Sequence, residues 1–185
     1  MAIARVLIAA AIVIAPSAAR AVDPFEIQVY DGTLADPGTL GAELHANTVV
    51  SGLRTAEPPE LPSHHQSHFT LEVAYVLTPV WEVGAYFQTA VLSDGSFKHA
   101  GDKLRTKVIV PVRAGSPFHF GVNVEIARIP EEFDRNVWGT ELRPIATWSS
   151  PGGAIYASIN PIVDLALGGP DRNEAPSFEP AATIR

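Results

Sequence analysis

The chain has 185 residues, no cysteine, and 13 basic against 20 acidic side chains, which gives a formal net charge of −7 at pH 7. This balance argues against a nucleic-acid partner, because binding to phosphates needs clustered Lys and Arg. A chain without cysteine cannot be stabilised by disulfides, so burial, hydrogen bonding or lipid must stabilise the fold.

Residues 1–21 are typical of a cleaved secretory signal peptide. Arg5 precedes the apolar run 6–15, and the small residues before Ala21 fit the rule for cleavage after that position. The apolar run is shorter than the roughly 20 residues that a membrane-spanning helix needs. We therefore expect residues 1–21 to be removed on export and to take no part in the fold.

Residues 22–38 lie between the signal peptide and the first clear strand. The part from Phe25 to Tyr30 alternates in polarity, but a spanning strand here would start a barrel on the outer side of the membrane. We expect residues 22–38 to lead into the fold from the periplasm or from within a lumen, or to contribute a short first strand.

Seven segments between Thr39 and Leu167 alternate apolar and polar side chains, and breaks rich in Gly, Pro, Asp or Ser separate them. Because successive side chains of a strand point to opposite faces, each segment has one apolar and one polar face. Helical periodicity is missing throughout. Residues 39–185 therefore predict an all-β domain with antiparallel up-and-down strands at 39–50, 68–77, 80–91, 102–112, 118–126, 138–148 and 154–167.

Two prolines fall inside the last two of these strands. Pro144 and Pro161 each remove a hydrogen-bond donor from the ladder, which usually marks an edge strand or a bulge. We expect 138–148 and 154–167 to be the least regular strands.

The polar faces favour a transmembrane β-barrel over a soluble sandwich. Acidic and basic residues recur on the polar faces of many strands, as in a lumen where opposite charges pair while lipid covers the apolar face. A secreted sandwich with a charged outer face is the alternative. The candidate lumen-lining residues are Glu43, His45, Glu72, Glu82, Lys103, Arg105, Lys107, Glu125, Glu141, Arg143 and Asp164.

Aromatic positions and loop lengths favour the same interpretation. Tyr75, Trp81, Phe118, Trp138 and Trp148 lie near strand ends on the apolar faces, where interfacial girdles would place them. Short breaks at 78–79, 114–117 and 149–153 alternate with longer ones at 51–67, 92–101, 129–137 and 168–177. Outer-membrane barrels alternate short periplasmic turns with longer outer loops in this way.

Several short segments resemble a family of proteobacterial outer-membrane β-barrels. These transporter-like proteins are loosely similar to barrels assigned to phenol-degradation pathways. The resemblance implies the barrel fold, but it implies no substrate and no catalytic residue. The segments that carry it are 25–32, 41–45, 78–79, 103–105, 141–145 and 160–162.

The end of the chain departs from that family. Such barrels continue through further strands, whereas this chain stops at Arg185 just after Phe178 begins another strand. Single-chain bacterial barrels have an even number of strands and leave no unpaired edge in lipid. We therefore expect a truncated, partial barrel, in which self-association could cover the open edges.

Other chemistry is weakly indicated. His64, His65 and His68 could bind a metal, but their spacing fits no standard zinc pattern and they follow three prolines in a long break, so a solvated loop is the simpler interpretation. Serines and glycine pairs fall in turns, and no G-x-S-x-G motif occurs. We expect no enzyme activity, no cofactor and no metal site.

The sequence thus predicts a porin-like channel or transporter for small solutes in the bacterial outer membrane, with outer-membrane lipid as its main partner. Lys103, Arg105, Lys107 and Arg143, opposed by the acidic residues, would set a transverse field that selects permeants. Two alternatives remain. The charges could pair and fill the lumen of a non-conducting structural barrel. The protein could instead be a secreted or periplasmic β-sandwich or lipocalin-like binding protein.

Overall fold

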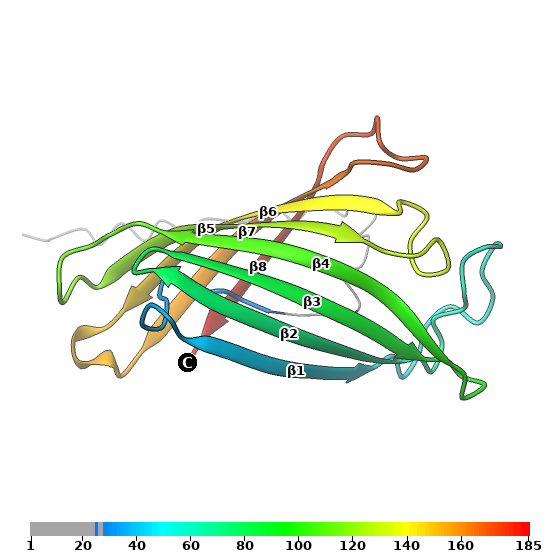
Figure 1. The fold of residues 1–185 in the computed structure, drawn as a ribbon, viewed down its shortest axis with the longest axis horizontal. Coiled ribbons are helices and arrows are strands. Elements are labelled where there is room, and N and C mark those ends of the chain that lie inside the picture. Colours follow the sequence, from blue (N-terminus) through cyan, green and yellow to red (C-terminus); the bar gives the residue numbers. More distant parts are fainter. Residues whose placement is uncertain (1–24, 26–27) are drawn as a thin grey trace, which may run out of the picture.

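A computed structural model describes Phe25 and residues 28–185, which form a single antiparallel sheet of eight strands (Figure 1). The predicted signal peptide lies outside the described residues, as does most of the stretch 22–27. A short 3-10 helix, η1 (Pro151–Gly153), lies between β6 and β7. The strands are β1 (Leu40–Thr48), β2 (Ser67–Thr78), β3 (Trp81–Val91), β4 (Phe97–Ile109), β5 (Phe118–Arg128), β6 (Trp138–Ser149), β7 (Tyr156–Ala166) and β8 (Ser177–Ile184).

Each strand pairs with the next one along the chain, so the sheet has an up-and-down order from β1 to β8. The prediction of an all-β, antiparallel up-and-down sheet is confirmed, as is a further strand at Phe178. The sheet curls into a half-barrel, with β1 and β8 as its two edges. Residues of both edge strands line the same cavity, so the curl brings the two edges to face each other.

The two faces of the sheet have the reverse of the polarity found in a soluble protein. Large apolar side chains are exposed on the convex face, with Leu44, Leu104 and Phe178 each more than 60% accessible. The concave face buries polar and charged side chains, among them His68, Thr70, Glu72, Gln88, Lys103, Arg105, Lys107, Asn123, Glu125, Arg143, Thr147, Ser158 and Asn160. Within the described residues, Phe25, Ala90 and Ala100 form a small cluster of buried apolar side chains, with Leu92 and Phe133 packed against it.

The predicted strand 102–112 differs from β4 (Phe97–Ile109) at both ends, and the predicted long break 92–101 is wrong as well. β4 begins at Phe97, and the β3–β4 connection is a tight turn in which Leu92 donates to the Ser96 carbonyl at 2.9 Å. The register shifts between Gln88 and Thr89, where β4 contains an extra residue before Gly101. This bulge reverses the alternation of β4, and the change of phase concealed the start of the strand.

Pro144 and Pro161 do not mark edge strands, because β6 and β7 are interior strands, but the ladder between these strands is irregular, as expected. The β6–β7 pairing stops after Leu142 and Val163 and resumes in the same register at Ala146 and Ile159. Pro144 and Pro161 lie inside this gap, so the missing donors interrupt the ladder without shifting it. The curvature of the sheet continues through the interruption.

The three longest connections, which precede β2, β6 and β8, lie at one end of the half-barrel together with the tight β3–β4 turn (Figure 1). The opposite end, which carries the connections before β3, β5 and β7, is called the short-turn end. At the end with the long connections, the loop before β2 contacts the loop after β5, since Leu61 donates to the Glu132 carbonyl at 2.9 Å. Asn136 in turn donates to Asp171 in the loop before β8 at 2.9 Å. These contacts join three loops into one cap. None of the helices in the described residues is long and apolar enough to cross a membrane.

Candidate functional site in the concave face

The predicted lumen-lining residues lie on the concave face, where most of them form ion pairs. Glu43, Glu72, Glu82, Arg105 and Lys107 line a cavity of about 680 Å³ at the end with the short turns. The others line a second cavity of about 260 Å³ toward the loop cap; these are Lys103, Glu125, Glu141, Arg143 and Asp164. His45 lies beside Glu72 at the β1 edge.

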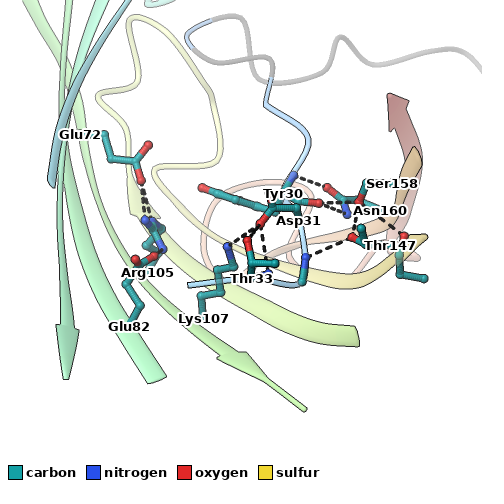
Figure 2. Close-up of polar contacts among 12 residues, drawn as sticks. Tyr30, Asp31, Thr33, Glu72, Glu82, Arg105, Lys107, Thr147, Ser158 and Asn160 are labelled. Atoms are coloured by element: carbon teal, nitrogen blue, oxygen red, sulfur yellow. Dashed lines mark hydrogen bonds and ion pairs between the residues drawn. The ribbon is translucent and has the colours of Figure 1, made fainter. Parts of the chain in front are cut away.

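Arg105 is the centre of the first charged group (Figure 2). Its guanidinium donates to Glu72 Oε1 from Nε at 2.8 Å and from Nη2 at 2.6 Å, and to Glu82 Oε1 from Nη1 at 2.7 Å. The side chains of Arg105 and Glu72 are each 4% exposed. Buried charges are tolerated when they are paired and hydrogen-bonded in this way. One guanidinium on β4 is therefore shared by a carboxylate of β2 and a carboxylate of β3.

The second charged group spans β4 to β7. Lys103 Nζ lies 3.5 Å from Glu125 Oε2, and Arg143 Nε donates to Glu141 Oε1 at 2.6 Å. Asp164 is the cross-strand neighbour of Glu141, so two carboxylates face the same cavity. Alternation predicts the face of these charges but leaves their pairing open. In the structure Lys103 pairs with Glu125 and Arg143 with Glu141.

A stretch that the sequence analysis left undecided crosses the concave face. We call Phe25 and residues 28–35 the inner segment. It begins under the loop cap, where the ring of Phe25 packs against Phe133 at 5.6 Å and His68 at 4.3 Å between ring centroids. It ends at the short-turn end, and the chain then enters β1, with Gly38 donating to the Val76 carbonyl at 2.8 Å. Residues 28–30 are not in a strand, and Gln28, Val29 and Tyr30 border the cavity on the concave face.

Tyr30 is the main anchor of the inner segment (Figure 2). Its backbone N–H donates to Asn160 Oδ1 at 2.7 Å, and its carbonyl accepts from Asn160 Nδ2 at 3.0 Å and Ser158 Oγ at 2.7 Å. Its hydroxyl hydrogen-bonds with that of Tyr86 and lies 3.4 Å from Glu125 Oε1. Tyr30 is therefore fixed by its side chain from β3 and β5 and by its backbone from β7.

Three cations surround the Tyr30 ring. The guanidinium carbon of Arg143 lies 4.7 Å from the ring centroid. The guanidinium carbon of Arg105 and the ammonium nitrogen of Lys107 each lie 5.4 Å from it. Cations within about 6 Å of an aromatic face are attracted to its electron-rich surface. The basic residues thus bind the inner segment as well as the neighbouring acids.

Asp31 and Gly32 continue this contact toward the short-turn end. Asp31 Oδ1 lies 3.8 Å from Lys107 Nζ and accepts from the Thr33 hydroxyl at 2.7 Å. Burial opposes ionisation of Asp31, but the bonds from Thr33 and the charge of Lys107 outweigh it and lower the pKa of the carboxyl. Gly32 passes so close to β5 that an added Cβ would lie 2.7 Å from His119.

The histidines named in the sequence analysis do not come together. His64 and His65 stack in the loop before β2 at 3.8 Å between ring centroids, whereas His68 is buried in β2 and bonds to Gln66 at 2.9 Å. Within the described residues, potential metal-binding atoms converge in one different group, Glu43, His45 and Glu72. His45 and the two glutamates were predicted as lumen residues, but not as a set.

The neutral residues that fix the inner segment were missed as site residues. Tyr86, Thr147, Ser158 and Asn160 all fall on the predicted polar faces of their strands. Alternation alone places them on the polar faces, but only His45 and charged residues were predicted to line the lumen. Nothing local in the sequence connects them with Tyr30, which is 130 positions from Asn160.

Comparisons with known proteins find no match, whether with family models, curated proteins or solved structures. The family resemblance of the sequence segments gains no support from them. Any functional argument therefore depends on the geometry of the concave face.

Proposed function

We propose that the protein is an outer-membrane β-barrel component whose charged lumen passes small solutes, and that the inner segment narrows this passage. The observation that carries the proposal is the inverted polarity of the sheet. Charged residues such as Arg105 and Glu125 are buried on the concave face, while large apolar side chains cover the convex face. Lipid is the environment in which such an outer face is stable.

The exposed aromatic residues support the same proposal. Tyr75, Trp81, Phe118, Trp138 and Trp148 are each 37–50% accessible on the apolar face. All five lie at or near strand ends, where amphipathic rings would meet the membrane interface. A soluble sandwich or lipocalin-like protein would instead turn these rings into an apolar core.

A sheet in lipid cannot have unpaired edges, so the proposal requires partners for β1 and β8. A second copy of the half-barrel or further strands could supply them. Closure would enclose the two cavities, one bordered by Phe25 and the other by Tyr30 and Asp31 of the inner segment. Solutes would then move between a compartment around Arg105 and one around Arg143.

A non-conducting barrel is the second candidate, and the pairing of the charges favours it. Glu72, Glu82, Glu125 and Glu141 are each within ion-pair distance of a cation, and the inner segment occupies the space between the walls. Fully paired charges leave a weaker field for selecting permeants. In that case the protein would act as a membrane anchor.

Fractionation followed by conductance separates these possibilities. We expect the expressed protein to sediment with outer membranes and to remain there through a carbonate wash. Purified protein in planar bilayers should then show small, discrete conductance steps. Membrane retention without conductance would favour the anchor, and a soluble, monodisperse product would overturn the barrel.

A further inference from the structure

We infer that Glu43, His45 and Glu72 form a binding site for a divalent transition-metal ion, with zinc as the best chemical fit. Glu43 and His45 are two residues apart on β1 and therefore face the same side. Glu72 is the direct cross-strand partner of Glu43 on β2. The strand pairing thus brings one imidazole and two carboxylates together.

The distances suit a metal ion. His45 Nε2 lies 3.5 Å from Glu72 Oε2 and 3.8 Å from Glu43 Oε2, and all three atoms lie within 4.8 Å of one another. Ligands about 2.1 Å from a tetrahedral zinc ion are separated by about 3.4 Å, so small side-chain rotations would complete the site. Imidazole nitrogen and carboxylate oxygen are common zinc ligands, and water would fill the remaining position.

Two buried atoms at the centre of the group, Glu72 Oε2 and His45 Nε2, form no hydrogen bond within the described part of the chain, although they lie 3.5 Å apart. Glu72 is 3% exposed. Leaving a buried polar atom unsatisfied costs free energy, which is larger for a charged group. A cation between the two atoms would satisfy both.

Neighbouring groups orient the ligands and leave room for a positive ion. Arg105 holds Glu72 by Oε1, which directs Oε2 toward His45. Such an outer partner orients a metal-binding carboxylate. Arg105 also binds Glu82, and Lys107 borders the same cavity. The carboxylates of Glu43, Glu72 and Glu82 outnumber these two cations, so the group retains net negative charge. Glu43, with its side chain 66% exposed, gives the ion a route from solvent.

The cross-strand arrangement supplies a further reason for a cation. Like charges directly opposite on neighbouring strands destabilise a sheet, and Glu43 and Glu72 form such a pair. A divalent ion would convert this repulsion into a shared contact. The binding of an ion at this position would therefore tie the edge strand β1 to β2.

The test is a titration of the untagged, full-length protein, folded in detergent, with zinc, in which isothermal titration calorimetry measures the binding. We expect saturable binding of one ion per chain. His45→Ala should weaken it by about tenfold or more, and Glu43→Gln should weaken it as well. His45 and Glu43 lie outside the ion pairs of Arg105, so both variants should fold, which circular dichroism would check. One folded variant is enough for the binding test.

Two control variants locate the ion. His119→Ala, on the wall of β5, should leave binding unchanged, and so should the double variant His64→Ala/His65→Ala in the loop. Absence of saturable binding would overturn the site. Binding that survives His45→Ala and Glu43→Gln, or that disappears with the loop histidines, would overturn it too. The readout is independent of conductance, so it stands apart from the proposed passage of solutes.

Discussion

The lipid-facing role of the convex face can be tested by placing a charge on it. Leu104 lies in β4 between Ala85 of β3 and Ile126 of β5, and it is 68% exposed. If lipid covers this face, Leu104→Arg puts a guanidinium near the bilayer midplane, which costs about 2–4 kcal/mol. The folding equilibrium constant would fall roughly 30- to 700-fold.

Leu53 provides a matched control, because it is also 68% exposed but lies in the loop before β2. Leu53→Arg should change the free energy of unfolding by no more than about 0.5 kcal/mol, as is usual for a solvated position. Both variants would be unfolded with urea from lipid vesicles and followed by tryptophan fluorescence. If Leu104→Arg proved as stable as Leu53→Arg, the convex face would not be in lipid.

Three further predictions concern the interior. Arg105→Gln leaves Glu72 buried without its cation and should lower the free energy of unfolding in vesicles by about 3–5 kcal/mol. Gly32→Ala puts a methyl group 2.7 Å from β5 and should displace the inner segment and raise single-channel conductance, whereas Gly41→Ala, with 4.0 Å of clearance, should not. Because the pKa of Asp31 is lowered in the folded protein, its ionised carboxylate stabilises the fold above pH 3.8, and this contribution is lost as the pH falls further. The free energies of unfolding of the wild type and of Asp31→Asn should therefore converge in acid.

Each of these outcomes has a clear opposite. Arg113 is exposed, so Arg113→Gln serves as the control and should leave the free energy of unfolding almost unchanged. If Arg105→Gln lowered it no more than Arg113→Gln does, the buried ion pairs would contribute little to stability. Equal conductance of Gly32→Ala and Gly41→Ala would show that the inner segment does not limit passage. A constant stability difference between Asp31→Asn and the wild type from pH 7 to pH 2 would remove the proposed linkage.

The alternation of side chains was sufficient to predict the strands and their faces. Each of β1 to β7 overlaps its predicted range, and Glu72, Lys103 and Arg143 all lie on the polar side. The start of β4 was missed because the bulge before Gly101 breaks the period on which the method depends. A two-residue period reports a face reliably only where the register is uninterrupted.

The path of the inner segment and the pairing of the charges could not be predicted in this way. Tyr30 is fixed by Asn160, and Gly32 by Thr147, over sequence separations of 130 and 115 residues. Alternation shows which face a side chain occupies, but not which strand lies across the lumen. The metal-ligand group depends in the same way on the register of β1 against β2, which brings Glu72 opposite Glu43.

The position of the inner segment also constrains the order in which the molecule can be assembled. The segment runs from the loop cap at Phe25 to the short-turn end before β1, and it lies in the space that β1 and β8 both border. Any partner that joins those edges seals that space. Once the wall is complete, the segment could leave only lengthwise, toward the short-turn end where the chain continues into β1, with Phe25 withdrawn from Phe133 and the loop cap. Closure would therefore confine the segment sterically, in addition to the hydrogen bonds and ion pairs that hold it.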